Sequence, residues 1–293
     1  MSRGLDHIVH AVRDLDAAAA FYRRLGFTVG ARNSHPWGTH NHIVQLPGFF
    51  VELLTVAEPE KLAGEGFATL FGSFNQAFLQ SREGLSYLML ESQDAAADAR
   101  DFDAAGIAVS RALTFEREGV RPDGSKLKVG FSLAFARDAG AAAIGFATCR
   151  QHNPENFWNR SLQQHPNGAS AVANAVIVAE NPSDHHIFLS AFTGERELHA
   201  TSSGVTAATP RGDLAIMDTA AFRSHFGVQP PDTAGGARLA AIRFTVRGRE
   251  ALIAALEAGA VPHILHMGHV VVAPEVAMGA TLVFGTSGNI GPG

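Results

Sequence analysis

Residues 5–12 form an apolar run that polar side chains interrupt at three positions. The segment reads Leu-Asp-His-Ile-Val-His-Ala-Val, and we predict that it is a β-strand. Because successive strand residues point to opposite faces, we expect Leu5, His7 and Val9 on one face and Asp6 on the other.

A helix and a second apolar strand are predicted to follow. Asp14 is a suitable N-cap, apolar residues recur behind it at helical spacing, and Gly26 suits the left-handed turn that ends many helices. The second strand, residues 49–54, carries a single carboxylate, Glu52, in an otherwise apolar run. The opening therefore predicts a strand–helix–strands unit that contains one histidine and one glutamate.

The same order of elements recurs three more times, starting near residues 85, 173 and 239. Each copy begins with an apolar strand and continues through an amphipathic helix to a glycine, which argues for an internal repeat. One such unit leaves a face of its short sheet uncovered, so copies must pair to bury or enclose that face. We predict an α+β fold in which four tandem βαβββ modules pair into two half-open barrels, each with a cleft.

Domain boundaries follow from the repeat. We expect a first domain at residues 1–151, a connecting segment rich in Asn, Pro and Gln at residues 152–168, and a second, degenerate domain at residues 169–293. Residues 58–84 form an insertion with phenylalanines at helical spacing, which predicts a helix packed over a cleft mouth, against a barrel or across a homodimer interface.

Composition narrows the class of protein. The 293 residues are 46% hydrophobic and 17% charged with a net charge of −5, so we expect packed cores and neither nucleic-acid nor membrane-surface binding. No apolar segment resembles a signal peptide or a membrane span. The single cysteine, Cys149, rules out an internal disulfide and fits a reducing compartment, so we expect a cytoplasmic protein.

His7 and Glu52 are the strongest candidates for chemistry. An imidazole nitrogen and a carboxylate oxygen together suit Fe, Mn, Ni, Co or Zn as divalent ions, with water in the open positions. A carboxylate within an apolar strand is costly to bury unless it meets a cation, an arginine or a proton. The alternative is that Glu52 pairs with an arginine and His7 is a core histidine with its hydrogen bonds satisfied.

The loop and strand at residues 35–42 are rich in polar groups. His40 and His42 share a strand face, which is compatible with metal binding, although a surface or hydrogen-bonding role is the alternative. Gly38, Thr39 and Asn41 can offer amide groups to a substrate carboxylate, and the alternative is a tight turn.

The repeat and its motifs resemble the βαβββ modules of the vicinal-oxygen-chelate superfamily, which includes glyoxalase I and the extradiol dioxygenases. Five segments are similar to its glyoxalase-like domain family, namely residues 5–9, 25–27, 35–41, 51–53 and 151–158. The resemblance implies a divalent metal in the cleft, held by His7, Glu52 and a third ligand, for which His152 is the first candidate and His40 the alternative. It also implies Glu52 as the catalytic residue and His35, Gly38, Thr39, Asn41 and Gln151 as substrate-binding residues.

The partner modules differ from module one at the matching positions. Tyr87, Asn174 and Arg243 stand where further first-strand ligands would be expected. The leading hypothesis is a metal-dependent lyase, isomerase or dioxygenase acting on a small oxygenated metabolite. The alternatives are a protein of the same fold that sequesters a small ligand without any metal, and a structural or regulatory dimer.

Overall fold

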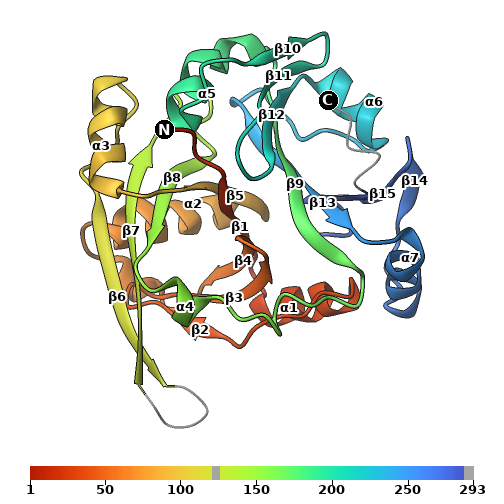
Figure 1. Ribbon diagram of the computed structural model, residues 1–293, viewed down its shortest axis with the longest axis horizontal. Coiled ribbons are helices and arrows are strands. Elements are labelled where there is room, and N and C mark those ends of the chain that lie inside the picture. Colours follow the sequence, from red (N-terminus) through yellow and green to blue (C-terminus); the bar gives the residue numbers. More distant parts are fainter. Residues whose placement is uncertain (121–125, 287–293) are drawn as a thin grey trace.

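The computed structural model describes residues 1–120 and 126–286, and within them the strands form two eight-stranded, strongly curled sheets (Figure 1). The first sheet has the order β2-β3-β4-β1-β5-β8-β7-β6. Its strands are β1 (Leu5–Ala11), β2 (Asn33–Ser34), β3 (Thr39–Leu46), β4 (Phe49–Val56), β5 (Gly84–Glu91), β6 (Leu113–Val120), β7 (Lys126–Ala136) and β8 (Gly145–Gln151).

The second sheet repeats this plan with the order β10-β11-β12-β9-β13-β16-β15-β14. Its strands are β9 (Ala169–Val178), β10 (His199–Thr201), β11 (Gly204–Ala207), β12 (Asp213–Met217), β13 (Arg238–Val246), β14 (Ile264–His266), β15 (His269–Val272) and β16 (Thr281–Gly285). In each sheet the two central strands are antiparallel, and each of them is parallel to its outer neighbour. The four predicted modules and the α+β fold of two half-open barrels are therefore confirmed.

One helix follows the first strand of each module. These helices are α1 (Leu15–Arg24), α3 (Ala95–Ala104), α5 (His186–Thr193), which η3 (Pro182–His185) precedes, and α7 (Arg249–Ala258). The side chains of Asp14 and Asp94 cap the first two by accepting backbone N–H groups, and Gly26 takes the predicted left-handed conformation at φ 80°. Among the described helices, none is both long and apolar enough to cross a lipid bilayer.

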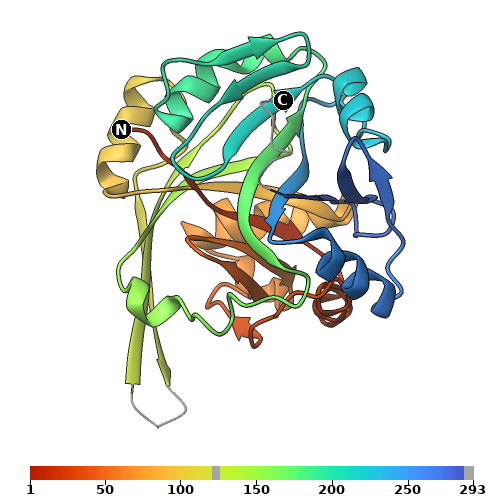
Figure 2. The ribbon, with the colours of Figure 1, turned by 45° about the vertical axis from the view of Figure 1, so that its right-hand side comes forward.

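A single large apolar core joins the two sheets. The helix α1 contacts α7, and α3 contacts α5, so the helices pack in pairs taken from different halves of the chain (Figures 1 and 2). Aromatic side chains close the junction, because Phe27 packs against Phe244 and Phe284 at centroid distances of 5.3 and 6.1 Å. The opposite, concave face of each sheet therefore takes no part in this shared core.

The concave faces are covered by different elements. In the second sheet α6 (Thr219–Phe226) packs Phe222 and Phe226 onto the apolar residues of that face. Over the first sheet lies the predicted insertion, which forms η1 (Pro59–Leu62), the π-helix η2 (Ala68–Ser73) and α2 (Phe74–Ser81). Phe71 of η2 is buried within the same chain, which confirms the intramolecular packing of this insertion.

A β-bulge interrupts β1 at Asp6. In the pairing with β5, Leu5 lies opposite Leu90 and His7 lies opposite Met89, so Asp6 has no partner. Leu5 consequently joins the core between the sheets, whereas Asp6 and His7 are brought together. The predicted placement of Leu5 with His7, and of Asp6 on the opposite face, is wrong because alternation cannot register an extra residue.

Candidate active site

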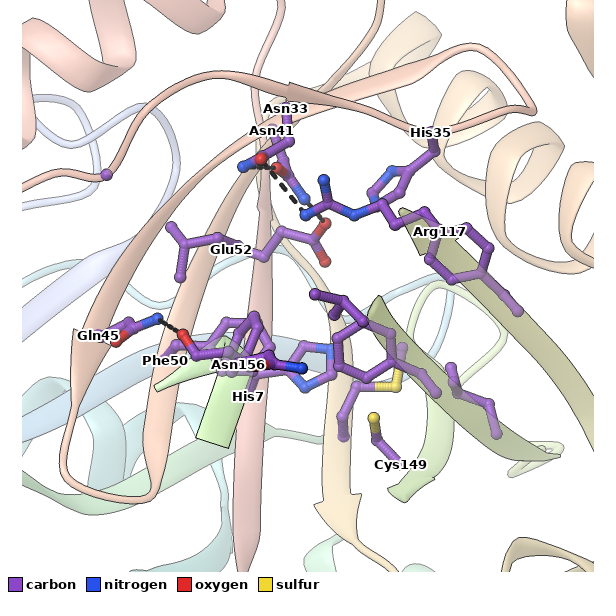
Figure 3. Close-up of a pocket in the computed structure, with 18 of the residues that line it drawn as sticks. His7, Asn33, His35, Asn41, Gln45, Phe50, Glu52, Arg117, Cys149 and Asn156 are labelled. Carbon is purple, nitrogen blue, oxygen red and sulfur yellow. Dashed lines mark hydrogen bonds between the residues drawn. The ribbon is translucent and has the colours of Figure 1, made fainter. Parts of the chain in front are cut away.

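A cavity of about 560 Å³ lies on the concave face of the first sheet (Figure 3). Seven aromatic side chains line it, namely Trp37, Phe50, Phe67, Phe71, Phe115, Phe131 and Phe157. The polar groups that reach it include His7, Asn33, His35, Asn41, Gln45, Glu52, Arg117, Cys149, Asn156 and Asn159. An apolar cavity with a few convergent polar groups is typical of a small-molecule site.

The His7 ring is held in place on two sides. Its Nδ1 lies 2.6 Å from Oδ1 of Asp6, and its ring stacks on Phe50 at 4.2 Å between centroids, with an interplanar angle of 11°. Gln151 donates from Nε2 to the second oxygen of Asp6 at 3.1 Å. Because an ionised carboxylate only accepts hydrogen bonds, Nδ1 of His7 donates to Asp6, which leaves Nε2 as the ring nitrogen that faces other partners.

Glu52 lies on the same sheet face as His7. The register pairs His7 with Phe50 and Val9 with Glu52. His7 and Glu52 therefore lie on neighbouring strands with an offset of two residues, which keeps their side chains on the same face. Asn41 donates from Nδ2 to Oε1 of Glu52 at 2.5 Å. Burial raises the pKa of Glu52, and the charge of His7 and the hydrogen bond from Asn41 act in the opposite direction.

A stack of three rings forms one wall of the cavity. His35 stacks on Trp37 at 4.7 Å, and Trp37 stacks on Phe67 at 4.9 Å, with interplanar angles of 9° and 14°. Burial, reinforced by Arg117 and His40, lowers the pKa of His35 to about 3, so this ring is neutral. The buried indole nitrogen of Trp37 has no hydrogen-bond partner in the part of the chain that the structure describes, so its N–H group is an unused donor there.

Arg117 on β6 brings a positive charge to the cavity. Its Nη2 donates to Oδ1 of Asn33 at 3.3 Å, and both residues line the cavity. In Figure 3 the Arg117 side chain lies on the same side of the cavity as Asn33, Asn41 and His35. A ligand that carries a carboxylate therefore has a cationic partner available there.

The connecting segment closes part of the cavity. It contains the short helix α4 (Pro154–Phe157), and Gln45 on β3 fixes it by donating to the carbonyl of Phe157 at 2.8 Å and accepting the amide of Asn159 at 2.9 Å. Phe157 contacts Phe50 at 5.0 Å between centroids. This segment thus contributes side chains to the site as well as linking the two halves of the chain.

The second module supplies different groups at the positions related to His7 and Glu52 by the repeat. Tyr87 replaces His7, and its hydroxyl donates to the carbonyl of Leu70 in η2. Its ring lies over Gly145, where a Cβ would stand 2.1 Å from the ring. Since Tyr87 pairs with Gly145 as His7 pairs with Phe50, the position related to Glu52 is Ala147.

Cys149 lines the cavity near His7. Burial, together with the charges of Asp6 and Glu52, raises the pKa of its thiol. A protonated thiol is a poor nucleophile and a poor metal ligand.

The structure separates the predicted site residues into two groups. His7, His35, Asn41 and Glu52 line the cavity, and Gln151 contacts it indirectly through Asp6. The remaining predicted residues do not line it, namely Gly38, Thr39, His40 and His152.

Each residue of the second group has partners elsewhere. Gly38 forms a turn at φ 89°, and the Thr39 hydroxyl lies 2.9 Å from Nδ1 of His35. His40 contacts Glu58 at 3.1 Å, and His152 contacts the hydroxyl of Ser132 at 2.8 Å. Their predicted roles in binding substrate or metal remain predictions.

Asp6, Asn33 and Arg117 are among the site residues that sequence reasoning did not single out. Asp6 is adjacent to His7 in the sequence, but strand alternation points it away from that ring. Asn33 and Arg117 lie 84 positions apart, and only closure of the curled sheet brings them together. For Asp6, the available signal was its position next to His7 at the start of an apolar strand.

Comparison with known proteins identifies relatives of the whole architecture. A family model described as a glyoxalase-like domain matches residues 5–193. A search of curated proteins finds no significant match. A hypothetical protein from Staphylococcus aureus has a similar structure, with 14% identity, a TM-score of 0.69, and coverage of 97% of this chain and 99% of that one.

Two further structures are similar at lower scores. A fusion protein of a xylose isomerase-like TIM barrel with 4-hydroxyphenylpyruvate dioxygenase has 14% identity and a TM-score of 0.52, covering 90% of this chain and 40% of that one. A mutant 4-hydroxymandelate synthase from Streptomyces coelicolor has 11% identity and a TM-score of 0.52, covering 91% and 78%. At these identities the likeness shows the fold alone.

Proposed function

The chain belongs to the glyoxalase-like domain family of the vicinal-oxygen-chelate superfamily, and from this premise we propose that it is an enzyme that transfers protons on a small aromatic carbonyl compound. The reaction class is that of an isomerase or a lyase. The observation that carries the proposal is the pairing of an oriented imidazole, His7, with a buried carboxyl group, Glu52, on the floor of an aromatic cavity.

The two groups have complementary protonation states. Asp6 holds His7 with Nε2 as the basic atom, whereas burial favours the protonated form of Glu52. Because Asn41 donates to Oε1 of Glu52, the carboxyl proton belongs on Oε2. One group can therefore accept a proton while the other donates one, which is the arrangement that general acid–base catalysis requires.

A divalent metal is the group that the family resemblance implies, and the donor set does not complete a site for it. Protein sites for such ions generally use three or more ligands. Within the described residues, the set of three potential ligands that comes together is Asp6, His7 and Cys149, and it does not include Glu52. Both Asp6 oxygens already accept hydrogen bonds, and the Cys149 thiol is protonated.

The repeat-related positions do not complete the set either, because Tyr87 and Ala147 stand there. This donor set favours proton transfer over the insertion of oxygen, since a dioxygenase needs a site that activates O₂. The reaction proposed here therefore runs through the side chains alone.

The proposed reaction begins with the substrate ring between the aromatic walls and its carbonyl oxygen toward Glu52. Nε2 of His7 removes a proton from the carbon next to the carbonyl, while the Oε2 proton of Glu52 passes to the carbonyl oxygen, giving a neutral enol. In an isomerisation, His7 returns its proton to a different carbon or face while the enol O–H returns its proton to Glu52. In an elimination, the enol O–H returns its proton to Glu52 as the carbonyl re-forms, and a leaving group on the next carbon departs with its bonding electrons and takes the proton from His7. Positive charge on His7 lowers the pKa of Glu52, so the two transfers assist each other.

Ligand sequestration without chemistry is the second candidate. The aromatic lining, the neutral His35 and the cationic Arg117 would bind an aromatic acid whether or not it reacts. The two candidates share the cavity but differ in whether the carbon-bound protons of the ligand exchange with solvent.

Deuterium exchange tests the proposal without knowledge of the final product. A panel of aryl 2-oxo acids and aryl ketones is incubated in D₂O with chelator-treated protein, and loss of the proton next to the carbonyl is followed by NMR. We expect exchange with wild type and a large loss with His7→Gln or Glu52→Gln. His186→Gln, at an exposed position on α5, serves as the control.

Binding of a panel compound by calorimetry without any exchange would refute the enzyme proposal and leave sequestration. Exchange that appears only after Mn²⁺, Zn²⁺, Ni²⁺ or Fe²⁺ is added would refute the metal-independent reaction.

A further inference from the structure

A row of polar side chains crosses the second sheet on its concave face. Asp213 pairs with Asn174 between β12 and β9, and Asn174 pairs with Arg243 between β9 and β13. His269 on β15 continues the row beside Gly285 of β16. Two positions further along these strands lie the apolar residues that α6 covers. The row is therefore the polar end of a face that is otherwise apolar.

Arg243 is buried there without a counter-charge in contact. Its exposed fraction is 7%, and among the described residues its polar partner is His269, whose Nε2 lies 3.4 Å from Nη2. No ion pair joins it to a carboxylate in the described part of the chain, and Asp213 is the acid whose charge it feels. Taking a charge out of water without a partner is costly, so this guanidinium calls for an anion.

His269 offers a second group that lacks its partner. Because Nε2 of His269 faces an arginine N–H, it accepts, and the neutral ring must carry its proton on Nδ1. Burial, followed by the charge of Arg243, lowers the pKa of His269 and keeps the ring neutral. Within residues 1–120 and 126–286, the buried Nδ1 has no hydrogen-bond partner, so it is an N–H donor that lacks an acceptor there.

The absence of a side chain at Gly285 lets the His269 ring pack directly against the backbone of β16, because a Cβ there would lie 2.8 Å from Nδ1 of His269. Asn174 faces the same row, and its buried Oδ1 has no hydrogen-bond partner among the residues that the structure describes. A primary amide can turn either its oxygen or its NH₂ group toward a ligand.

We propose that this row binds one small oxyanion, a carboxylate or phosphate group, through the Arg243 guanidinium, the Nδ1–H of His269 and the amide of Asn174. Asp213 at the end of the row disfavours a second negative charge, so a monoanionic carboxylate should bind more tightly than phosphate. His225 on α6 and His266 also face these groups. The proposal is independent of the reaction assigned to the first cavity.

The test is a titration of the full chain with sodium acetate and with inorganic phosphate, at constant ionic strength set by sodium chloride. In the Arg117→Gln variant, which lacks the cationic partner of the first cavity, thermal unfolding and calorimetry should show saturable binding of one acetate per chain, because a ligand that binds only the native state raises the melting temperature. Arg243→Gln should abolish it. Arg243→Lys keeps the charge but loses the guanidinium fork, so it should weaken binding about tenfold or more.

Three further variants make the outcome decisive. Gly285→Ala adds a methyl group that must displace the His269 ring, so it should abolish acetate binding without any change in charge. Arg247→Gln removes an equal charge from an exposed residue just beyond β13, and Arg117→Gln removes the arginine of the first cavity, so both should keep binding.

The proposal is overturned by several results. Acetate and phosphate could raise the melting temperature no more than chloride does, which would mean non-specific screening. Gly285→Ala could bind acetate as wild type does, or Arg117→Gln could abolish binding. Should Arg243→Gln fail to fold, Gly285→Ala and Arg243→Lys still decide the question.

Discussion

Replacement of His10 by glutamine should change how the stability of the protein depends on pH. His10 is fully buried in β1, with Nδ1 at 2.9 Å from the Tyr22 hydroxyl and Nε2 at 3.1 Å from the carbonyl of Met278. A carbonyl only accepts, so Nε2 carries the proton and Nδ1 accepts from Tyr22. The neutral ring thus links α1 to a loop of the second half of the chain.

The magnitude follows from the pKa. Burial lowers the pKa of His10 from 6.5 to about 4, although the Met278 carbonyl and Glu83 act in the opposite direction. Since the pKa is lower in the folded state, the unfolded chain binds the proton first, and stability is lost as pH falls from 6.5 toward 4. At 1.36 kcal/mol per pKa unit, the free energy of unfolding falls by about 2 kcal/mol between pH 7 and pH 5, and by about 3.4 kcal/mol once the pH is well below 4.

Urea unfolding of wild type and His10→Gln at pH 7, 6 and 5 measures this contribution. The variant loses hydrogen bonds, so we expect it to be less stable by roughly 1–3 kcal/mol at pH 7. The deficit should shrink by about 2 kcal/mol at pH 5, because glutamine does not titrate. His186→Gln, an exposed replacement, should show no such convergence. If the difference between wild type and His10→Gln is the same at pH 7 and pH 5, the neutral, buried state assigned to His10 is wrong.

Three other predictions concern the site and the core. Asp6→Asn removes the carboxylate that orients His7 and should lower the deuterium-exchange rate about 10- to 100-fold with little change in KM; an unchanged rate would show that Asp6 is not a positioning residue. Because burial raises the pKa of Glu52, wild type loses stability as the pH rises through that pKa. Glutamine does not titrate, so the urea midpoint of Glu52→Gln should rise relative to that of wild type between pH 5 and pH 9. A difference between the two midpoints that stays constant with pH would contradict this. Phe192→Ala opens a cavity in the core shared by the sheets and should cost about 3–5 kcal/mol in denaturant unfolding, whereas a cost below about 1 kcal/mol would argue against a continuous core.

The order of elements was predictable because it depends on local sequence. Alternation, N-caps such as Asp14 and terminal glycines such as Gly26 mark strands and helices without knowledge of the fold. Repetition of that order then supplied the pairing of the modules. Alternation, caps and terminal glycines each lie within or beside one strand or helix, which is the range over which sequence periodicity is informative.

The site was only partly predictable because its geometry depends on pairing between distant strands. His7 and Glu52 could be singled out as polar residues within apolar strands, yet Asp6 joins them through a bulge that is defined by β5. Arg117 reaches the cavity because the sheet curls. The neighbours Gln151 and His152 illustrate the same difficulty, since one contacts Asp6 and the other contacts Ser132.

The packing of helices from both halves into one core has a consequence for how the chain can vary. A fragment ending after β8 would leave Phe27, Phe102 and Phe146 in water, because Phe244, Phe192 and Phe188 cover them. The two halves should therefore be inherited, expressed and degraded together. Substitutions in the second half that loosen this packing would also disturb the first sheet, whose other face forms the cavity. Selection for chemistry in one half therefore also preserves the packed interior of the other.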